Sequence, residues 1–472
     1  MAKENELQVL RRVRPTPEQI SIVRRIQTGA SLIRGAAGSG KTTTALLALR
    51  ASTGATVNQL RNQEALPANI LVLTYYNSLC GYVRAVVQEE MEDYADDIRI
   101  FTSTFDKWAH DTLELRGGRS YDLCKSKLQS LAQKFQGDVQ FIIDEVNYLR
   151  GRFKPDRLQD YITAERTGRG TTPAMPRALR QRLLDEVVQP YLDWKEANSH
   201  RDFHDNAIEM MHVCADFKYD VIVVDEAQDL SLNQLRAVTN HAADDATIIF
   251  VTDTAQRIYP RGGTWLEAGI VISPGRSLRL NVNYRNTRQI ASLAACIAQG
   301  LGVDDDGSLP NPALCSRDGD LPTVIYGRFP DQVEYAMRLL QNVDLENETV
   351  GFLHLKGGGY FRDIRSALTA EGLEFCELQG ASVWPEDDSN IGLCTFHSAK
   401  GLEFDHVFML GLDQEFARYG DGDDDDRYNS HRRLVAMGVG RARESVVIGA
   451  MRERALALVN NIDTNLVNVV DL

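Results

Sequence analysis

The chain has 472 residues, of which 43% are hydrophobic, so its length suggests two to four domains with sizeable cores. With 66 acidic and 52 basic residues the net charge is −14, which argues against broad nonspecific binding to a polyanion but leaves room for a local basic groove. Seven scattered cysteines without a CxxC pair indicate reduced thiols rather than disulfides or a zinc site. Neither a signal peptide nor a membrane span is recognisable, so we expect a cytoplasmic protein with no membrane partner.

Near its N-terminal end, the sequence predicts a helix that begins at Pro17. Thr16 suits the cap, Pro17 suits the first helical position, and Gln19 completes a capping box. The amide of Gln19 is also a candidate for reading an adenine edge, because an amide offers both a donor and an acceptor. The residues alone leave both interpretations open.

The pattern that begins at Gly35 is a phosphate loop: a glycine, four residues, then Gly-Lys-Thr. Glycines at 35, 38 and 40 allow the backbone to turn, with positive φ where needed, so that its N–H groups converge on a phosphate. Lys41 adds a positive charge and Thr42 offers a hydroxyl to Mg²⁺. A short apolar strand precedes the loop and a helix follows it, as phosphate binding requires. We therefore predict a nucleoside triphosphate site formed by Gly35, Ala36, Ala37, Gly38, Ser39, Gly40, Lys41, Thr42 and Thr43.

Two further strand-like segments, 70–74 and 98–101, open into hydroxyl and aromatic side chains. In an α/β sheet, ligands bind where strand ends open into loops. Hydroxyls with aromatics suit phosphates and unstacked bases. Core packing is the stronger competing interpretation for Phe101 and Trp108.

Helical segments joined by polar turns are expected from about residue 115 to 215. Within them, the stretch from Arg150 to Arg182 carries nine basic residues against three acidic ones. This local excess marks a candidate nucleic-acid contact, and a solvated charged face is the alternative of equal weight.

Four consecutive apolar residues at 221–224 predict a strand that is buried on both faces and ends in two carboxylates. Asp225 suits the Mg²⁺ shell, and Glu226 is placed to orient and deprotonate an attacking water. A second buried strand at 247–252 leads to Gln256, which is either a sensor of the terminal phosphate or a solvated loop amide. A second α/β unit is expected to begin at Leu278.

Several segments, in the right order, resemble superfamily 1 helicases of the UvrD/Rep type. The resemblance runs from about Pro15 to Ile448. The segments similar to that family's Mg²⁺ and hydrolysis, third, fourth, fifth and sixth motifs are 225–229, 253–259, 283–287, 395–404 and 432–443.

The resemblance implies an α/β fold with two RecA-like P-loop motor domains built on parallel sheets. Residues 1–114 and 216–277 would form the first domain, 115–215 a helical and partly basic insertion in it, and 278–472 the second domain. ATP and Mg²⁺ would bind between the two domains. Closing and reopening around ATP would move one domain against the other along a single strand.

Carried over position by position, the resemblance also assigns roles. Gln19 would read adenine and Tyr284 would stack on it, while Glu403 would contact the ribose. Phosphate, Mg²⁺ and hydrolysis would be served by Lys41, Thr42, Asp225, Glu226 and Gln256, with Arg285 and Arg441 as arginine fingers. The single strand of nucleic acid would be contacted by Thr74, Tyr75, Thr104, Phe105, Tyr259 and His397.

Three features depart from the family's pattern. After Tyr259 the usual stacking aromatic is missing, because Pro260 follows. Gly440 stands where a threonine usually precedes the arginine finger, which loosens the local helix without removing charge. The stretch between Arg285 and Ile391 is too short for the large inserted subdomain of full-length relatives, so translocation is a safer expectation than vigorous duplex separation.

The leading hypothesis is therefore an ATP-dependent translocase or helicase on single-stranded DNA or a single-strand/duplex junction, with 3′-to-5′ polarity implied by the resemblance alone. The alternative is an ATP-switched adaptor that recruits or licenses a partner nuclease in DNA repair or phage defence. Turnover stimulated by single strands favours the motor, and slow strand-independent turnover favours the switch. An unrelated P-loop kinase or GTPase would not need the segments around Tyr284 and His397, and an inactive homologue would not retain the full set of site residues.

Overall fold

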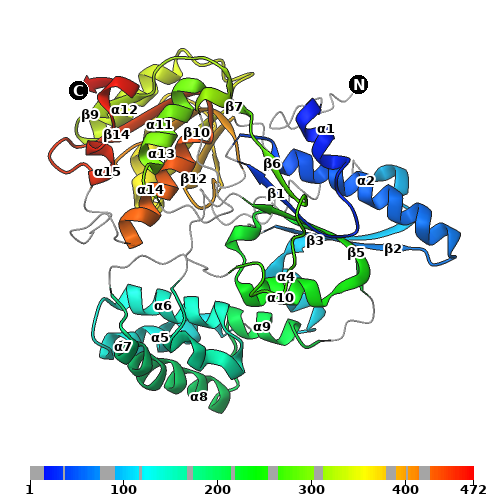
Figure 1. Cartoon of the computed structure of the whole chain (residues 1–472). Coiled ribbons are helices and arrows are strands. Elements are labelled where there is room, and N and C mark those ends of the chain that lie inside the picture. Colours follow the sequence, from blue (N-terminus) through cyan, green and yellow to red (C-terminus); the bar gives the residue numbers. More distant parts are fainter. Residues whose placement is uncertain are drawn as a thin grey trace.

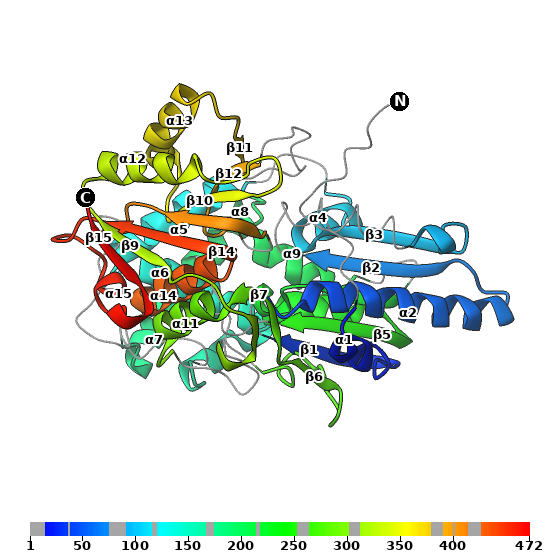
Figure 2. The ribbon, with the colours of Figure 1, turned by 90° about the horizontal axis from the view of Figure 1, so that it is seen from above.

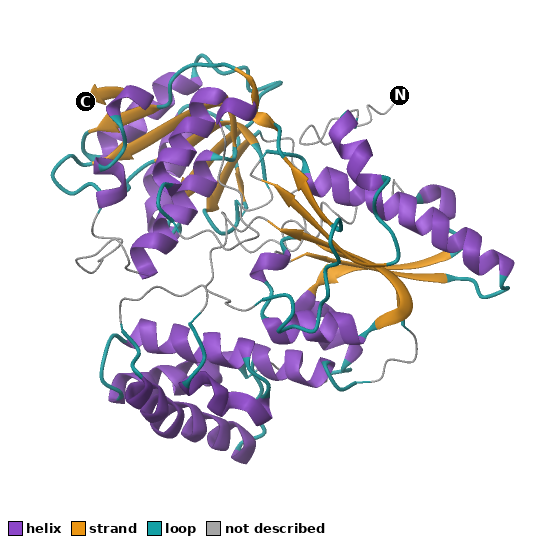
Figure 3. Ribbon diagram, viewed as in Figure 1, coloured by secondary structure: helices purple, strands orange, loops and turns teal. Residues whose placement is uncertain are grey.

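The structure is a computed structural model that describes residues 15–35, 38–74, 91–115, 120–166, 174–213, 218–252, 264–301, 312–378, 390–399, 402–413 and 426–472. Most strands gather in two large, separate sheets, and an all-helical body lies beside the first of them (Figures 1 and 3). This confirms the predicted α/β fold with a helical insertion. No helix of the described residues is both long and apolar enough to cross a membrane.

The first sheet has six parallel strands, so all of its strands end at the same edge. That edge is where a parallel sheet presents ligand-binding loops. From one side to the other the order is β3 (Ile98–Thr104), β2 (Ala68–Thr74), β4 (Tyr219–Val224), β5 (Ala242–Thr252), β1 (Gly29–Gly35) and β6 (Ser277–Leu280).

Helices cover both faces of this sheet. Along β4, Val221 and Val223 pack into the cluster that includes α2, whereas Ile222 and Val224 pack into the cluster on the opposite face. This alternation confirms the strand buried on both faces that the apolar run predicts. One face is covered by α1 (Pro17–Val23) and α2 (Lys41–Asn62), and the other by α4 (Phe105–Thr112), α9 (Phe203–Met210) and α10 (Leu232–Asn240).

The predicted boundary between the domains falls inside a strand of the first sheet. We expected the second unit to begin at Leu278, but β6 pairs in parallel with β1. Both Leu278 and Leu280 are buried in the core beneath α2. Burial of these two leucines draws the segment to the first sheet, so the division lies after Leu280.

The insertion is a helical bundle with its own apolar core. Its elements are α5 (Tyr121–Lys134), α6 (Val139–Arg152), the 3₁₀ segment η2 (Pro155–Ile162), α7 (Arg177–Leu183), the π-helical turn η3 (Leu184–Val188) and α8 (Gln189–Ala197). In Figure 1 the bundle lies below the first domain, next to α9 and α10.

Much of the basic excess in this insertion is used internally. Arg150 is buried and paired with Asp202 and Asp205, and Arg166 is paired with the buried Glu145. Arg180 donates to the backbone carbonyl oxygens of Tyr161, in η2, and Ala164, just after it. The predicted nucleic-acid contact therefore loses three of the cations on which it was based, because carboxylates and carbonyls elsewhere in the bundle engage them.

The second sheet has seven strands, again all parallel. Seen from above, α12 and α13 lie on one side of it and α11, α14 and α15 on the other (Figure 2). The strand order is β11 (Cys376–Glu377), β12 (Ile391–Thr395), β10 (Val350–His354), β13 (Phe404–Met409), β14 (Ala442–Ala450), β9 (Thr323–Tyr326) and β15 (Asn468–Asp471).

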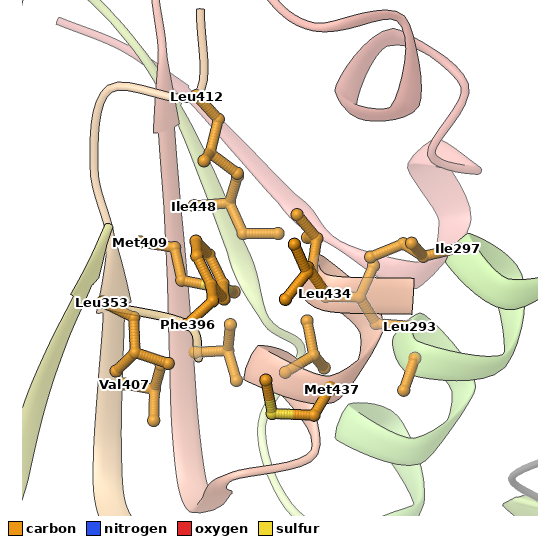
Figure 4. Packing of buried hydrophobic residues seen from close by; sticks show 14 of the residues in the cluster. Leu293, Ile297, Leu353, Phe396, Val407, Met409, Leu412, Leu434, Met437 and Ile448 are labelled. Atoms are coloured by element: carbon orange, nitrogen blue, oxygen red, sulfur yellow. The ribbon is translucent and has the colours of Figure 1, made fainter. Parts of the chain in front are cut away.

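The helices of the second domain are α11 (Arg288–Ala298), α12 (Phe329–Leu340), α13 (Phe361–Ala370), α14 (Asp426–Val439) and α15 (Ala457–Asn460). A separate two-stranded pair, β7 (Asn283–Thr287) and β8 (Cys315–Arg317), stands where the chain enters this domain. Helix α14 packs closely on the sheet: Leu434 and Met437 meet Phe396 and Met409 in the core that Figure 4 shows.

The close packing of α14 depends on Gly438. A Cβ at this position would run into the ring of the fully buried Phe396, whose Cδ1 lies 2.8 Å away, and would lie 3.0 Å from Met409 Sδ. We expect Gly438→Ala to lower the free energy of unfolding by about 1–3 kcal/mol, because overpacking outweighs the better helix propensity of alanine. Thermal and urea unfolding would measure it. Gly359→Ala, where no atom lies within 4 Å, is the matched control, and equal stability of both variants would contradict the packing argument.

Candidate nucleotide-binding site

The phosphate loop connects β1 to α2, as the sequence predicts. Gly38 (φ +78°) and Gly40 (φ +77°) both adopt the left-handed conformation that glycine permits at little cost. Gly35 has no positive φ and is needed for space instead, because a Cβ there would meet Ser39 Oγ and lie 3.0 Å from Leu280 Cβ. Ala36 and Ala37 lie outside the described residues.

The loop and the carboxylate-bearing strand meet directly. Thr42, in the first turn of α2, donates through Oγ1 to Asp225 Oδ2 at 2.9 Å. Although β5 separates β1 from β4, α2 packs across both β4 and β5 and so brings Thr42 to the end of β4. Lys41 Nζ donates to the Gly35 carbonyl oxygen at 2.7 Å, so its charge lies within the loop.

The two adjacent carboxylates occupy a constrained turn. Glu226 adopts the left-handed conformation (φ 53°, ψ 40°), which is uncommon for a side chain other than glycine and costs free energy. Its N–H donates to Asp225 Oδ1 at 2.9 Å, and the Gln228 amide donates to Glu226 Oε2. Burial, and then the charge of Glu226, raise the pKa of Asp225 to about 6, while the hydrogen bond from Thr42 acts in the opposite direction.

These groups fit a nucleotide with Mg²⁺. A hydroxyl and a carboxylate are the hard oxygen ligands that Mg²⁺ prefers, and Mg²⁺ usually takes only one or two protein ligands beside phosphates and water. Such a site needs no larger cluster, and the described residues contain no group of three or more His, Cys, Asp or Glu side chains arranged to hold a metal. The cation would also favour the charged form of Asp225, which burial disfavours.

The structure confirms one of the two interpretations of Gln19, the capping box. Its Oε1 accepts from Thr16 N at 2.9 Å and its own N–H donates to Thr16 Oγ1 at 3.2 Å, which confirms the capping box. Its Nε2 also lies 3.4 Å from the carbonyl oxygen of Gly40, beside the phosphate loop. The assignment to adenine stays a prediction.

The second domain reaches the loop through β7. Tyr284 N donates to the Gly38 carbonyl oxygen at 3.1 Å, and Arg285 Cβ lies 2.8 Å from where a Cβ of Gly38 would be. Tyr284 is 38% exposed, so the residue remains accessible for the predicted stacking. The sequence did not indicate this direct contact between the two domains.

The two predicted arginine fingers differ in position. Arg285 pairs with Glu403, which is also held by Arg443 at 2.9 Å. Arg441 is only 3% exposed and contacts Met437 and Leu402 inside the second domain. The structure therefore brings Arg285 and Glu403 together near the loop, whereas the contacts described for Arg441 lie within the second domain.

Arg443 is a member of this cluster that sequence reasoning missed, although it lies within the segment similar to the sixth motif. Burial would raise the pKa of Glu403, but the charges of Arg285 and Arg443 outweigh it and lower the pKa to about 2. Glu403 is thus a permanent anion between two cations. Gln256 lies outside the described residues, so its assignment stays a prediction.

The residues that were predicted to contact the nucleic-acid strand are only partly accessible. Thr74 is buried at the end of β2, and Thr104 caps α4 by accepting from Lys107 N at 3.4 Å. Phe105 is 2% exposed and packs edge-to-face on Trp108, because the first turn of α4 points it into the core. The ring of Phe105 is therefore too buried to stack on a base as predicted.

Three more residues were predicted to contact the nucleic-acid strand. His397 is half-buried after β12, and Tyr75 and Tyr259 lie outside the described residues. Core packing of Trp108 is confirmed, whereas Phe101, on the edge strand β3, is 40% exposed and was wrongly expected in the core.

Two parallel-sheet domains, a phosphate loop and a paired carboxylate motif define a P-loop protein with two RecA-like domains. The family model described as UvrD/REP helicase N-terminal domain matches residues 16–268, and the UvrD-like helicase C-terminal domain matches residues 362–453. Because the first match alone covers more than half of the chain, the chain belongs to the UvrD/Rep helicase family.

Individual relatives are distant. The chain is 33% identical to the ATP-dependent DNA helicase Rep of Escherichia coli (strain K12) over 69 residues, which is 15% of this chain and 10% of the length of Rep. It is 22% identical to a probable DNA helicase of Mycoplasma pneumoniae over 446 residues, covering 88% of this chain and 79% of that protein. A solved C-terminal domain of a possible DNA helicase from Lactobacillus plantarum WCFS1 matches with 22% identity and a TM-score of 0.30, over 40% of this chain and 99% of its own.

The Glu403 cluster leads to a prediction about stability. Replacing Glu403 with Gln leaves Arg285 and Arg443 facing each other without an anion, so we expect a loss of about 1–3 kcal/mol in the free energy of unfolding at pH 7. The pKa of Glu403 is lower in the folded state, so its contribution is fully present above the unfolded pKa of about 4.3 and is lost as pH falls toward 2.

Chemical unfolding of both proteins across this pH range would measure the difference. The gap between wild type and Glu403→Gln should close as pH falls below about 4.3. Glu444→Gln, which removes an exposed pair with Arg317, is the control and should cost little at any pH. A gap that stays constant down to pH 2 would contradict the electrostatic account.

Proposed function

We propose that this chain binds and hydrolyses ATP with Mg²⁺ and couples hydrolysis to movement along single-stranded DNA with 3′-to-5′ polarity. The observation that carries the proposal is the hydrogen bond between Thr42 and Asp225, beside Glu226. The second domain also contacts the phosphate loop, through Tyr284. The printed names of its relatives, which are DNA helicases, support the choice of DNA. The polarity rests on the resemblance to the family alone.

Each residue has a defined task in this proposal. The loop glycines orient backbone N–H groups toward the phosphates, and Lys41 adds positive charge there. Thr42 and Asp225 would hold Mg²⁺, which neutralises charge on the phosphates when it is bound. Glu226 orients the attacking water and accepts its proton.

Coupling to movement depends on residues of the second domain. Arg285 begins in an ion pair with Glu403 and would have to exchange that partner for a phosphate when the domains close. An arginine that arrives only on closure makes hydrolysis depend on domain position. Repeated closure and opening would then advance the two domains along a strand.

A second candidate is the ATP-switched adaptor that licenses a partner such as a nuclease. It is favoured by the resting contacts of the site: Lys41 already donates to Gly35, and Arg285 is already paired with Glu403. A site whose cations are engaged by the protein itself would suit slow turnover that a partner accelerates.

The deciding experiment is ATP hydrolysis with and without single-stranded DNA, with Glu226→Gln as the test variant. We expect strong stimulation by DNA in wild type, and a loss of about 10²–10⁴-fold in kcat in the variant, because glutamine cannot accept the proton. ATP binding, followed by fluorescence of an ATP analogue, should persist. Glu186→Gln, which alters an exposed pair in the insertion, is the matched control.

If wild type stays at basal turnover with DNA, RNA and duplex ends alike, the motor proposal for the isolated chain fails and the adaptor gains support. If DNA stimulates turnover, strand displacement on duplexes with 3′ or 5′ single-stranded tails tests polarity. Preferential displacement from a 5′ tail would overturn the proposed direction.

A further inference from the structure

Helix α6 of the insertion ends against helix α10, which follows the carboxylate motif. Gly151, near the end of α6, lies so close to Ser231 that a Cβ on the glycine would be 3.0 Å from Ser231 Cβ. Ser231 is the N-cap of α10 and forms a reciprocal capping box with Gln234. The insertion therefore contacts α10 at its N-cap.

Side chains of α10 also cap the end of α6. Asn233 is 1% exposed and donates through Nδ2 to the carbonyl oxygens of Arg150 at 2.8 Å and Phe153 at 2.9 Å. Arg236 donates through Nη1 to the carbonyl oxygen of Arg152 at 2.7 Å. The last carbonyls of a helix have no partner within it, so these bonds fix the end of α6 to α10.

The same helix end is held from its other side by buried charges. Arg150 donates to Asp202 and, at 2.8 Å, to Asp205, at the start of α9. Lys195 of α8 donates to both carboxylates, at 3.0 Å to Asp202 Oδ2 and 2.7 Å to Asp205 Oδ1. With every charge paired, α6, α9 and α10 meet at one rigid junction, which we name the α6–α9–α10 junction.

Only a short, bonded segment separates this junction from Glu226. Within it, Asp229 N donates to the Glu226 carbonyl oxygen at 2.9 Å, and Leu230 N donates to that of Ala227 at 3.2 Å. The segment is a single 3₁₀ turn, η4 (Ala227–Asp229), between Glu226 and the start of α10. A displacement of Ser231 is therefore passed on to Glu226, which already holds a strained left-handed backbone that depends on its surroundings.

We propose that the α6–α9–α10 junction is a positioning element for Glu226, through which the placement of the helical insertion sets the rate of hydrolysis. The proposal rests on the proposed function, because it takes from there the role of Glu226 with water. The contacts described for Gly151 and Asn233 lie at the junction and not at the nucleotide site, so both residues act through α10. The insertion is then a part of the hydrolytic machinery as well as an attachment to it.

Gly151→Ala tests the proposal, since alanine favours a helix yet forces Ser231 to move by a few tenths of an ångström. We expect the thermal midpoint to stay the same or rise, kcat to fall about tenfold, and KM for ATP to change less than twofold, because misplacement of a catalytic group affects the chemical step. A purely structural role would not separate kcat from stability in this way.

A rescue variant makes the test specific. In the double variant Gly151→Ala/Ser231→Gly the opposing Cβ is absent, and glycine is tolerated at an N-cap, so kcat should return toward wild type. Amide hydrogen exchange at residues 227–231 in nucleotide-free protein should speed up in the single variant and recover in the double variant. Gly359→Ala, in the second domain and in open space, is the control.

The outcomes separate the two proposals. If wild type does not hydrolyse ATP, the proposed function fails, and the exchange measurement still tests the junction. The junction proposal is overturned if wild type hydrolyses ATP and Gly151→Ala matches it in both kcat and hydrogen exchange. It is also overturned if the double variant Gly151→Ala/Ser231→Gly restores neither kcat nor hydrogen exchange. If Gly151→Ala does not fold, Arg236→Lys replaces it as the test variant. This substitution removes the paired hydrogen bonds to the carbonyl oxygens of Arg152 and Glu267. We expect it to lower kcat, and an unchanged kcat would overturn the junction proposal.

Discussion

The hydrogen bond between Thr42 and Asp225 is the contact on which the rest of the site depends. It joins the helix after β1 to the end of β4, across an intervening strand, and it exists only because all strands of the first sheet run in the same direction. A parallel sheet places every loop that follows a strand at one edge. Phosphate-binding backbone, hydroxyl and carboxylate are thereby assembled from segments far apart in the sequence.

The second domain shares this loop, and its charges are already paired there. Tyr284 is bonded to Gly38 through the backbone, while Arg285 is held by Glu403 within its own domain. A guanidinium that leaves an ionised carboxylate loses a favourable interaction, and another anion that takes the place of the carboxylate offsets this loss. Phosphate is such an anion, so this exchange would link nucleotide binding to a change of partner for Arg285.

Local spacing made most of the nucleotide site predictable, whereas long-range pairing did not. The phosphate loop and Asp225 are encoded in short contiguous patterns, and they lie where the sequence predicts. The use of Arg150 could not be foreseen, because its partners at Asp202 and Asp205 are distant in sequence and the pairing depends on the bundle fold. The burial of Phe105 likewise depends on how α4 packs on the sheet.

The order of elements brings the insertion close to the carboxylate motif. The chain leaves the first sheet after β3, builds the bundle, and returns through α9 into β4, which ends just before Asp225 and Glu226. The next helix, α10, then packs back against α9 and the end of α6. The carboxylate motif is therefore followed within a few residues by a helix that contacts the bundle, so a shift of the bundle relative to the sheet would act first on the end of the motif that leads into α10.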